Sequence, residues 1–246
     1  MLKVVILLPT YNEAQNIELL LLDIFFHTKK IKDWRIEVLV IDSQSHDGTQ
    51  QIVKNFQKKY PNLHLLQVKK EGLGKAYMRG YKYALEHFSP STFIQMDADL
   101  SHEPKEILHF LRSISDGADL VIGSRYIEGG SIPNDWAMHR KIFSKIGNYI
   151  IRIGIFDLAI TDWTTGYRAI NASFIKNLPK SIEQYTGYIF MIAVLNHIRL
   201  QKAVIQEIPI KFQNRHGGKS KLPAHKYIVD VLQYVAMHSP LVKIFR

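Results

Sequence analysis

Short apolar runs alternate with longer amphipathic segments through the first half of the chain, and this alternation constrains the fold more than any other feature. One run, EVLVI, is apolar at consecutive positions, as expected for a strand buried on both faces of a parallel sheet. The predicted strands are Val4–Leu8, Glu37–Ile41, Leu63–Val68, Thr92–Met96 and Leu120–Gly123. The helical segments between them are predicted to begin near Glu13, Thr49, Gly74 and Pro104.

The alternation predicts an α/β fold, in which right-handed crossovers build a mainly parallel sheet with helices on both faces. The pattern changes after Gly130 and predicts a C-terminal helical elaboration. Its elements are expected as helices at 134–155 and 187–200, a strand at 208–212, and a last helix from Ala224. Because the chain has no internal repeat and no long linker, residues 1–246 are expected to form a single domain.

The charge balance favours partners that carry phosphate. The chain has 32 Lys and Arg against 22 Asp and Glu, a formal net charge of +10, which suits nucleic acid, nucleotides or an anionic membrane surface. The absence of cysteine excludes disulfides, thiolate zinc sites and cysteine nucleophiles. No stretch has the roughly 18 consecutive apolar residues of a spanning helix, and the N-terminus does not resemble a signal peptide. We expect a soluble or peripheral protein.

Two acidic residues follow the fourth predicted strand directly. Ligands bind at the carboxyl ends of the strands in an open parallel sheet, and Asp97 and Asp99 stand at such an end. Their carboxylates, together with substrate phosphates, suit Mg²⁺ or Mn²⁺. Such an ion would offset the charge on a departing diphosphate. The alternative interpretation is a solvated turn whose acids cap the helix that begins near Pro104.

Polar segments also follow the first and second predicted strands. Tyr11 could stack on a nucleobase, and Glu13 could accept a hydrogen bond from a base or a ribose hydroxyl. Asp42 is interpreted as a partner of the base or ribose, whereas Asp47 could equally be a helix cap. The GLGK segment at 72–75 lacks the Ser or Thr of a phosphate-binding P-loop, so a Walker-type ATPase is not expected.

Basic residues that could bind phosphate are concentrated in the C-terminal half. Arg presents a planar fork that matches phosphate oxygens, and Lys adds a point charge. The residues are Arg125, Arg140, Arg168, Arg215 and the cluster Lys219–Lys221, although each alone could be a surface cation. The segment 138–156 mixes apolar residues with Arg and Lys, which predicts either a helix in a membrane interface or an ordinary core-facing helix.

The order of these motifs resembles that of the family 2 glycosyltransferases. The chain carries PTYNE, D-x-x-S-x-D-G-T, GLGKAY, MDADLSH, GSRY, TGYR and F-x-x-R-x-x-G-x-S-K between residues 7 and 221. Within the family it is similar to the polyprenol-phosphate (dolichol-phosphate) mannose synthases. The resemblance implies a GT-A fold and an inverting, Mg²⁺- or Mn²⁺-dependent transfer of a hexose. The donor would typically be GDP-mannose, and the acceptor polyprenyl or dolichyl phosphate.

The resemblance also assigns roles by position, with donor binding up to about residue 125 and acceptor binding and membrane contact from about 126. The nucleotide-sugar residues would be Pro9, Tyr11, Glu13, Asp42, Asp97 and Ala98, and the metal ligands Asp97 and Asp99. The lipid-phosphate residues would be Arg125, Arg140, Ser144, Arg215 and Lys221. Catalysis would depend on Asp97, Asp99, Arg125, Arg215 and Lys221. The protein would be cytoplasmic and peripheral on the cytoplasmic face of a membrane, bound directly or through a membrane subunit.

Three residues depart from the family pattern. Ser43 replaces the second of two aspartates, and Met191 and Ala193 replace an amide and a carboxylate. These changes leave open a different donor, such as UDP-glucose or a UDP-N-acetylhexosamine, and a weakened nucleotide-sugar-binding regulatory homologue. A glycan acceptor is a further alternative, which the basic segment at 212–221 disfavours. Nucleic-acid binding is not expected, because no recognised binding module is present.

Overall fold

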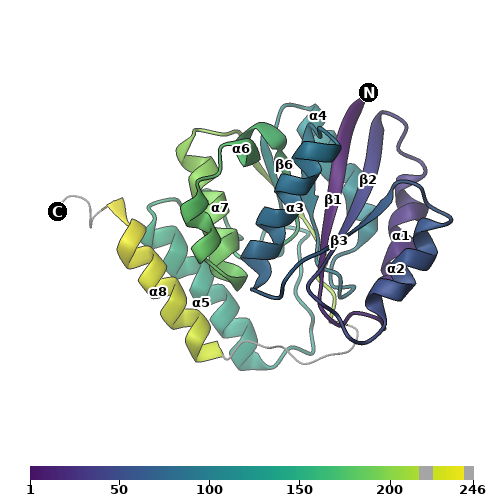
Figure 1. The fold of residues 1–246 in the computed structure, drawn as a ribbon. Helices are drawn as coiled ribbons and strands as arrows, with labels where there is room; N and C mark the ends of the chain where they lie inside the picture. Colours follow the sequence, from purple (N-terminus) through teal and green to yellow (C-terminus); the bar gives the residue numbers. More distant parts are fainter. Residues whose placement is uncertain (216–223, 241–246) are drawn as a thin grey trace.

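The computed structural model describes residues 1–215 and 224–240. In this part of the chain seven strands form one sheet in the order β3-β2-β1-β4-β6-β5-β7 (Figure 1). Neighbouring strands are parallel, except that β6 lies antiparallel between β4 and β5. The strands are β1 (Leu2–Thr10), β2 (Trp34–Asp42), β3 (Leu63–Gln67), β4 (Thr92–Gln95), β5 (Leu120–Ser124), β6 (Arg168–Asn171) and β7 (Ile205–Pro209).

Helices cover both faces of the sheet, because alternate side chains of each central strand point to opposite faces and both sets are apolar. Leu7 of β1 belongs to the core under α3 and α7, whereas its neighbour Ile6 belongs to the core under α1 and α4. The predicted α/β architecture is confirmed. The helices are α1 (Ile17–Thr28), α2 (Thr49–Gln57), α3 (Leu73–His87), α4 (Ile107–Ser115), α5 (Met138–Gly154), α6 (Ala172–Lys176), α7 (Gly187–Leu200) and α8 (Ala224–His238), with 3₁₀ turns η1 (Pro104–Glu106) and η2 (Lys180–Gln184).

Helices α5 and α8 form the predicted C-terminal elaboration and lie side by side, away from α1 and α2 (Figure 1). They approach closely at Gly154, where an added Cβ would lie 2.0 Å from Val235 Cγ1. Gly147, Asn148 and Ile151 are buried on the inner face of α5. Within the described ranges, no helix is long and apolar enough to cross a membrane.

The five strands predicted in the first half are present, but the C-terminal part of the sheet differs from expectation. The sequence indicated a loop around Arg168, yet this segment forms β6, which is inserted antiparallel between two strands of the parallel sheet. Strand β7 begins at Ile205, three residues before the expected Ile208, because it pairs with β5 from Leu120 onward. Beyond Pro209 the chain instead bonds to the loop after β5, where Ser131 N–H donates to Ile210 O.

The order in which strands are added to the sheet reverses at β1. Strand β2 follows β1 in sequence and lies on one side of it, whereas β4 lies on the other. In open α/β sheets a crevice forms at the carboxyl ends of the strands at such a switch point. The segments that leave β1 and β4 there are those that contain Tyr11 and Asp97.

Candidate active site

A cleft of about 470 Å³ opens at the switch point. Its floor comes from the ends of β1 and β4, and its walls come from the start of α3, the start of α7, the loop before β6 and Arg215. Seven of the residues predicted to bind the donor, the metal or the lipid phosphate line it, namely Pro9, Tyr11, Glu13, Asp97, Ala98, Asp99 and Arg215.

The two aspartates are held in different ways. Asp99 is buried, and its carboxylate accepts hydrogen bonds from the Ser101 hydroxyl at 2.5 Å and from Arg215 Nε at 2.6 Å. Asp97 has about a third of its side chain exposed, and its backbone N–H donates to His102 Nδ1 at 3.0 Å. Gly166 lies beside the Asp97 carboxylate, because a Cβ there would be 3.3 Å from Asp97 Oδ1. The backbone of this loop therefore reaches the acidic floor.

His102 supports the Asp97 loop as a neutral ring. It is buried and stacked on Tyr167, with 4.7 Å between the ring centroids. Because Nδ1 accepts from Asp97 N–H, the proton of the neutral ring is on Nε2, which lies 3.9 Å from Asp97 Oδ2. Burial lowers the pKa of His102 to about 4, so the ring carries no positive charge near neutrality. His102 was not singled out from the sequence, although it ends the MDADLSH motif.

The two carboxylates differ in charge as well. Burial, and next the charge of Asp99, raise the pKa of Asp97 to about 7. Burial also opposes ionisation of Asp99, but the hydrogen bond from Ser101 and the positive charge of Arg215 outweigh it and lower the pKa of Asp99. Within 4 Å of the Asp97 carboxylate, the His102 ring is the one basic group among the described residues. Asp97 is therefore a carboxylate that faces the cleft without a cationic partner there.

This arrangement fits a hard divalent cation, which prefers carboxylate and phosphate oxygens. The described residues contain no group of three or more His, Cys, Asp or Glu side chains that could hold a metal by themselves. Asp97 and Asp99 would therefore supply a minority of the ligands, with water and a substrate diphosphate completing the shell. Such a shared shell is typical of Mg²⁺ sites that form together with a phosphate substrate.

One wall of the cleft is built by the turns after β1 and β2. Tyr11 lies on the cleft, with Lys70 Nζ 3.5 Å from its ring centroid. Ser43, at the departure from the family pattern, also lines the cleft. Asp47 ties the two turns together, because its carboxylate accepts from Ala14 N–H at 2.9 Å and from Thr49 N–H at 3.0 Å. Asp47 precedes the N-cap residue of α2, Gly48, and accepts from the N–H of the first helical residue, so it does not occupy the N-cap itself.

Asp42 lies beneath this wall rather than on it. The side chain is fully buried and accepts hydrogen bonds from the Thr10 hydroxyl, from the Ser45 N–H and hydroxyl, and from Gln50 Nε2, at 2.6 to 2.9 Å. Both carboxylate oxygens are therefore in use within the protein. Asp42 shapes the turn that presents Ser43, and its direct contact with a nucleotide stays a prediction.

Arg125 is held by a partner that the sequence did not reveal. The side chain of Asp162 is fully buried and accepts from Arg125 Nε and Nη2, each at 2.7 Å, and Thr164 Oγ1 accepts from Nη2 at 2.8 Å. Burial opposes the charge of Arg125, but the Asp162 carboxylate outweighs it and raises the pKa of Arg125. In this structure the guanidinium fork faces Asp162 and not the cleft.

The other predicted cations are distributed over three environments. Arg140 stacks on Trp136, with 3.7 Å from its Cζ to the ring centroid, and Ser144 shares a 2.5 Å hydrogen bond with the Tyr126 hydroxyl. Neither lines the cleft. Arg168 is fully buried in β6 and donates to the carbonyl oxygens of Met191 and Trp163, so its interpretation as a phosphate-binding loop residue is wrong. Lys221 and the cluster Lys219–Lys221 lie outside the described residues.

Several residues that line the cleft were not predicted from the sequence, because only the packing of the folded chain brings them there. They are Lys70, Thr164, Gly166, Thr186 and Tyr188. Of the remaining departures, Met191 lines the cleft, whereas Ala193 is buried in the core under α7. The Met191 side chain therefore replaces a polar group at the site itself.

Comparison with known proteins identifies the family of the chain. The family model of Glycosyl transferase family 2 matches residues 5–178. The chain is 32% identical over 222 residues to the polyprenol monophosphomannose synthase of Mycolicibacterium smegmatis, covering 89% of this chain and 81% of the relative. It is 35% identical over 225 residues to the undecaprenyl-phosphate mannosyltransferase of Micrococcus luteus, covering 90% and 88%. A third relative is the dolichol-phosphate mannosyltransferase of Pyrococcus furiosus, 32% identical over 235 residues, covering 95% of this chain and 63% of that protein.

Among solved structures, the fold is similar to that of glucosyl-3-phosphoglycerate synthase from Mycobacterium tuberculosis in complex with Mn²⁺, uridine diphosphate and phosphoglyceric acid. The TM-score is 0.70 over 96% of this chain and 78% of that one, at 16% identity, a likeness of fold alone. The chain belongs to glycosyl transferase family 2 and is a glycosyltransferase with the GT-A fold.

Proposed function

We propose that this chain transfers mannose from GDP-mannose to polyprenyl or dolichyl phosphate. The observation that carries the proposal is the Asp97 carboxylate, which faces the cleft beside Asp99 without a cationic partner among the described residues. The names of the relatives support the sugar and the lipid phosphate. The Mn²⁺ in the glucosyl-3-phosphoglycerate synthase complex supports a divalent cation.

On the donor side, Asp97 and Asp99 would hold Mg²⁺ or Mn²⁺, which would offset the charge that develops on the departing diphosphate. Pro9, Tyr11 and Glu13 would receive the nucleotide, which is supported by their position on the cleft and by the contact of Lys70 with the Tyr11 ring. Ala98 lies between the two aspartates on the same wall. Asp42 would act from beneath by fixing this turn, in addition to any direct contact with the nucleotide.

On the acceptor side, the reaction needs alignment and charge compensation more than proton transfer. A phosphate monoester has a second pKa of about 6, so the lipid phosphate is largely dianionic near neutrality and can attack the anomeric carbon without a general base. Arg215 already stands in the cleft, bonded to Asp99. Arg215, Arg125, Arg140, Ser144 and Lys221 would together receive the lipid phosphate and offset its repulsion from the donor. Attack from the face opposite the diphosphate inverts the anomeric centre.

The two parts of the single domain would bind different substrates. Residues up to about 125 would bind the nucleotide sugar, and residues from about 126 to 246 would bind the acceptor and approach the membrane. Because the acceptor is a membrane lipid, the protein would work peripherally on the cytoplasmic face, where nucleotide sugars are available. Binding could be direct or through a membrane subunit.

A second donor is favoured by one observation. Met191 lines the cleft where the family pattern has an amide, so a hydrogen-bonding group is absent from the wall. If that amide reads a sugar hydroxyl, UDP-glucose or a UDP-N-acetylhexosamine would compete with GDP-mannose as the donor.

The test is transfer of radiolabelled sugar from GDP-mannose, UDP-glucose and UDP-N-acetylglucosamine to polyprenyl phosphate, with Mn²⁺ or EDTA. We expect mannosyl lipid from GDP-mannose, lost with EDTA and in Asp97→Ala. Asp116→Ala, at an exposed helix end, is the matched control and should retain activity. Product from a uridine donor alone would assign the second donor instead. Metal-dependent nucleotide binding without product from any donor would overturn the proposal and indicate a regulatory binding protein or another acceptor.

A further inference from the structure

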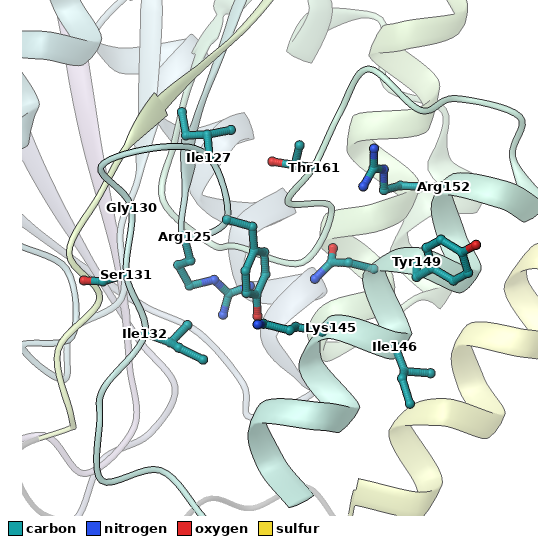
Figure 2. A pocket seen from close by; sticks show the side chains of 12 residues that line it. Arg125, Ile127, Gly130, Ser131, Ile132, Lys145, Ile146, Tyr149, Arg152 and Thr161 are labelled. Atoms are coloured by element: carbon teal, nitrogen blue, oxygen red, sulfur yellow. The ribbon is translucent and has the colours of Figure 1, made fainter. Parts of the chain in front are cut away.

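The cleft at the switch point adjoins a second pocket, of about 710 Å³, which lies between the loop after β5 and the helix α5 (Figure 2). Under the proposed function this pocket belongs to the acceptor side, because Arg125 and Tyr126 line it and Tyr126 shares a hydrogen bond with Ser144. The cleft and the pocket have no lining residue in common. They meet at Thr164, which lines the cleft and accepts a hydrogen bond of 2.8 Å from Arg125 Nη2. The donor and acceptor spaces are therefore neighbours.

Under the proposed function the hexose lies where these two spaces meet. At the start of the reaction its anomeric carbon is bonded to the donor diphosphate, and at the end it is bonded to the lipid phosphate. In an inverting transfer the attacking oxygen approaches opposite the leaving oxygen, so the two phosphates flank the sugar. The donor diphosphate would lie over Asp97 and Asp99, and the lipid phosphate beside the cations of the acceptor side. A residue that contacts the hexose therefore stands between the aspartates and those cations.

Tyr188, on the first turn of α7, stands at such a position. The residue lines the cleft and is 42% exposed. Burial raises the pKa of Tyr188, the charge of Arg125 lowers it, and the charge of Asp97 raises it again. Arg140 and Arg215 lower the pKa as well. Because the influence of a charge falls with distance, the hydroxyl lies near the donor carboxylate and near three cations of the acceptor side.

Helix α7 presents Tyr188 from a backbone that is anchored in the core. Met191 lies three residues further on and also lines the cleft, so the two side chains share one face of the helix. The Met191 carbonyl oxygen accepts a hydrogen bond of 2.6 Å from the fully buried Arg168, and Phe190 stacks on Tyr77 with 5.9 Å between the ring centroids. Of the two side chains on this wall, Tyr188 carries the strong hydrogen-bonding group, because a thioether accepts only weakly.

The tyrosine hydroxyl matches a sugar hydroxyl, because each can donate one hydrogen bond and accept others. The raised pKa of Tyr188 keeps its hydroxyl protonated near neutrality. A phosphate dianion offers acceptors alone, and the arginines around it already supply charged donors. A site that hydrogen-bonds a substrate hydroxyl discriminates strongly against a substrate that lacks it. These properties favour the hexose over either phosphate as the partner of Tyr188.

We propose that Tyr188 determines donor specificity through a hydrogen bond between its hydroxyl and one hydroxyl group of the transferred hexose. The inference rests on the proposed function for the positions of the two phosphates. Tyr188 acts on which sugar is transferred, whereas the aspartates and arginines act on the charges of the two phosphates.

The experiment is sugar transfer to polyprenyl phosphate by the wild type and Tyr188→Phe. The donors are the sugar nucleotide that the wild type uses, expected to be GDP-mannose, and a series of analogues that each lack one sugar hydroxyl. We expect Tyr188→Phe to lower kcat/KM for the complete donor about tenfold, the effect of one lost hydrogen bond. One analogue should be transferred equally well by both proteins, because the hydroxyl that Tyr188 contacts is already missing. Tyr83→Phe, on α3 and off the cleft, is the matched control and should equal the wild type with every donor.

Three further measurements separate a sugar contact from a structural role. The inhibition constant of GDP, the KM for polyprenyl phosphate and the thermal melt of Tyr188→Phe should all equal those of the wild type. Loss by the same factor with every analogue would overturn the proposal, as would transfer that equals the wild type with the complete donor. A change confined to the KM for polyprenyl phosphate would overturn it too and assign the hydroxyl to the acceptor.

Absence of transfer by the wild type from GDP-mannose, UDP-glucose and UDP-N-acetylglucosamine would count against the proposed function alone. Calorimetry with Mn²⁺ then tests the contact, by comparing the affinity of each sugar nucleotide with that of the nucleoside diphosphate without the sugar. A gain in affinity from the sugar that Tyr188→Phe loses would support the contact. No gain in the wild type, or a gain that the variant keeps, would overturn it.

Discussion

The two halves of the cleft region carry side chains of opposite charge. The half built from the ends of β1 and β4 presents carboxylates, and Asp97 lacks a cationic partner among the described residues. The half that leads to α5 presents cations, and a buried one among them, Arg125, is already paired with Asp162. The first half thus leaves one carboxylate, Asp97, without a Lys or Arg side chain within 4 Å among the described residues, whereas the buried cation of the second half has its own carboxylate partner.

The difference shows what each half contributes to binding two phosphorylated substrates. A carboxylate pair alone would repel a diphosphate, so under the proposed function a divalent cation would join Arg215 in offsetting the charge of the donor half. The acceptor half would attract phosphate with fixed side chains, and the burial of one of them, Arg125, is tolerated because Asp162 offsets its charge. Predictions that separate metal dependence from fixed charge therefore test the comparison directly.

The largest effect is expected from Asp97→Asn, which keeps the shape of the donor half but removes its unpaired charge. We expect kcat to fall about 10³-fold, because the stabilisation of the departing diphosphate is lost. Arg140→Gln in the acceptor half should cost less, since several cations share its task. Sugar transfer at saturating Mn²⁺ measures both. Equal losses in the two variants would remove the distinction between the halves.

The next effect concerns stability. Asp162→Asn leaves Arg125 buried and uncompensated, and we expect the free energy of unfolding to fall by about 3–5 kcal/mol. Glu71→Gln, which removes exposed ion pairs with Lys75 and Arg79, should cost far less, because solvent screens both pairs. Urea denaturation compares the two. A small loss for Asp162→Asn would mean that Arg125 finds water or another acceptor and that the acceptor half is not internally balanced.

His102→Leu tests the support of the donor half. The variant removes the acceptor for Asp97 N–H at the buried ring, and we expect Mn²⁺ affinity in the presence of GDP to fall about 10- to 100-fold. His102→Asn, whose amide oxygen can accept the same hydrogen bond, should recover part of the loss. Electron paramagnetic resonance of free Mn²⁺ gives the affinities. Equal affinity in the wild type and His102→Leu would contradict a positioning role.

The pH dependence of metal binding provides a smaller effect with a definite sign. Because the pKa of Asp97 is raised to about 7, protons compete with the cation below that value. Mn²⁺ affinity should be constant above about pH 8 and fall by up to tenfold for each unit below pH 7. His102 should not contribute, since its pKa is lowered to about 4. A flat titration down to pH 5.5 would show that Asp97 is ionised throughout.

The smallest effect is expected at Met191, on the wall of the donor half. Met191→Gln restores an amide to the cleft, and we expect a change of a few-fold in the KM for one sugar nucleotide over another, with little change in kcat. Ala193→Ser, at a buried position off the cleft, is the comparison variant. A change in kcat with no change in donor preference would place Met191 in support of the fold instead.

The sequence predicts the site residues of the first half better than those of the second. In the first half most predicted site residues follow a strand closely, so local patterns located Tyr11, Glu13, Asp97 and Asp99 correctly on the cleft. In the second half the sequence indicated a loop where β6 forms, because four residues that include an arginine carry too weak a pattern for a strand. Arg168 was therefore assigned to phosphate binding, although it bonds to buried carbonyl groups.

The sequence by itself determined the α/β architecture and the acidic floor, since these depend on periodicity and on residues adjacent along the chain. The switch point follows from the strand order, which only the tertiary structure decided. Only the tertiary structure decided that Asp42 lies beneath the wall and Ser43 on it, and that Asp162 pairs with Arg125. The physical reason is distance along the chain. Asp162 and Arg125 are 37 residues apart, and the burial that fixes their partnership exists only when the sheet and its helices have packed.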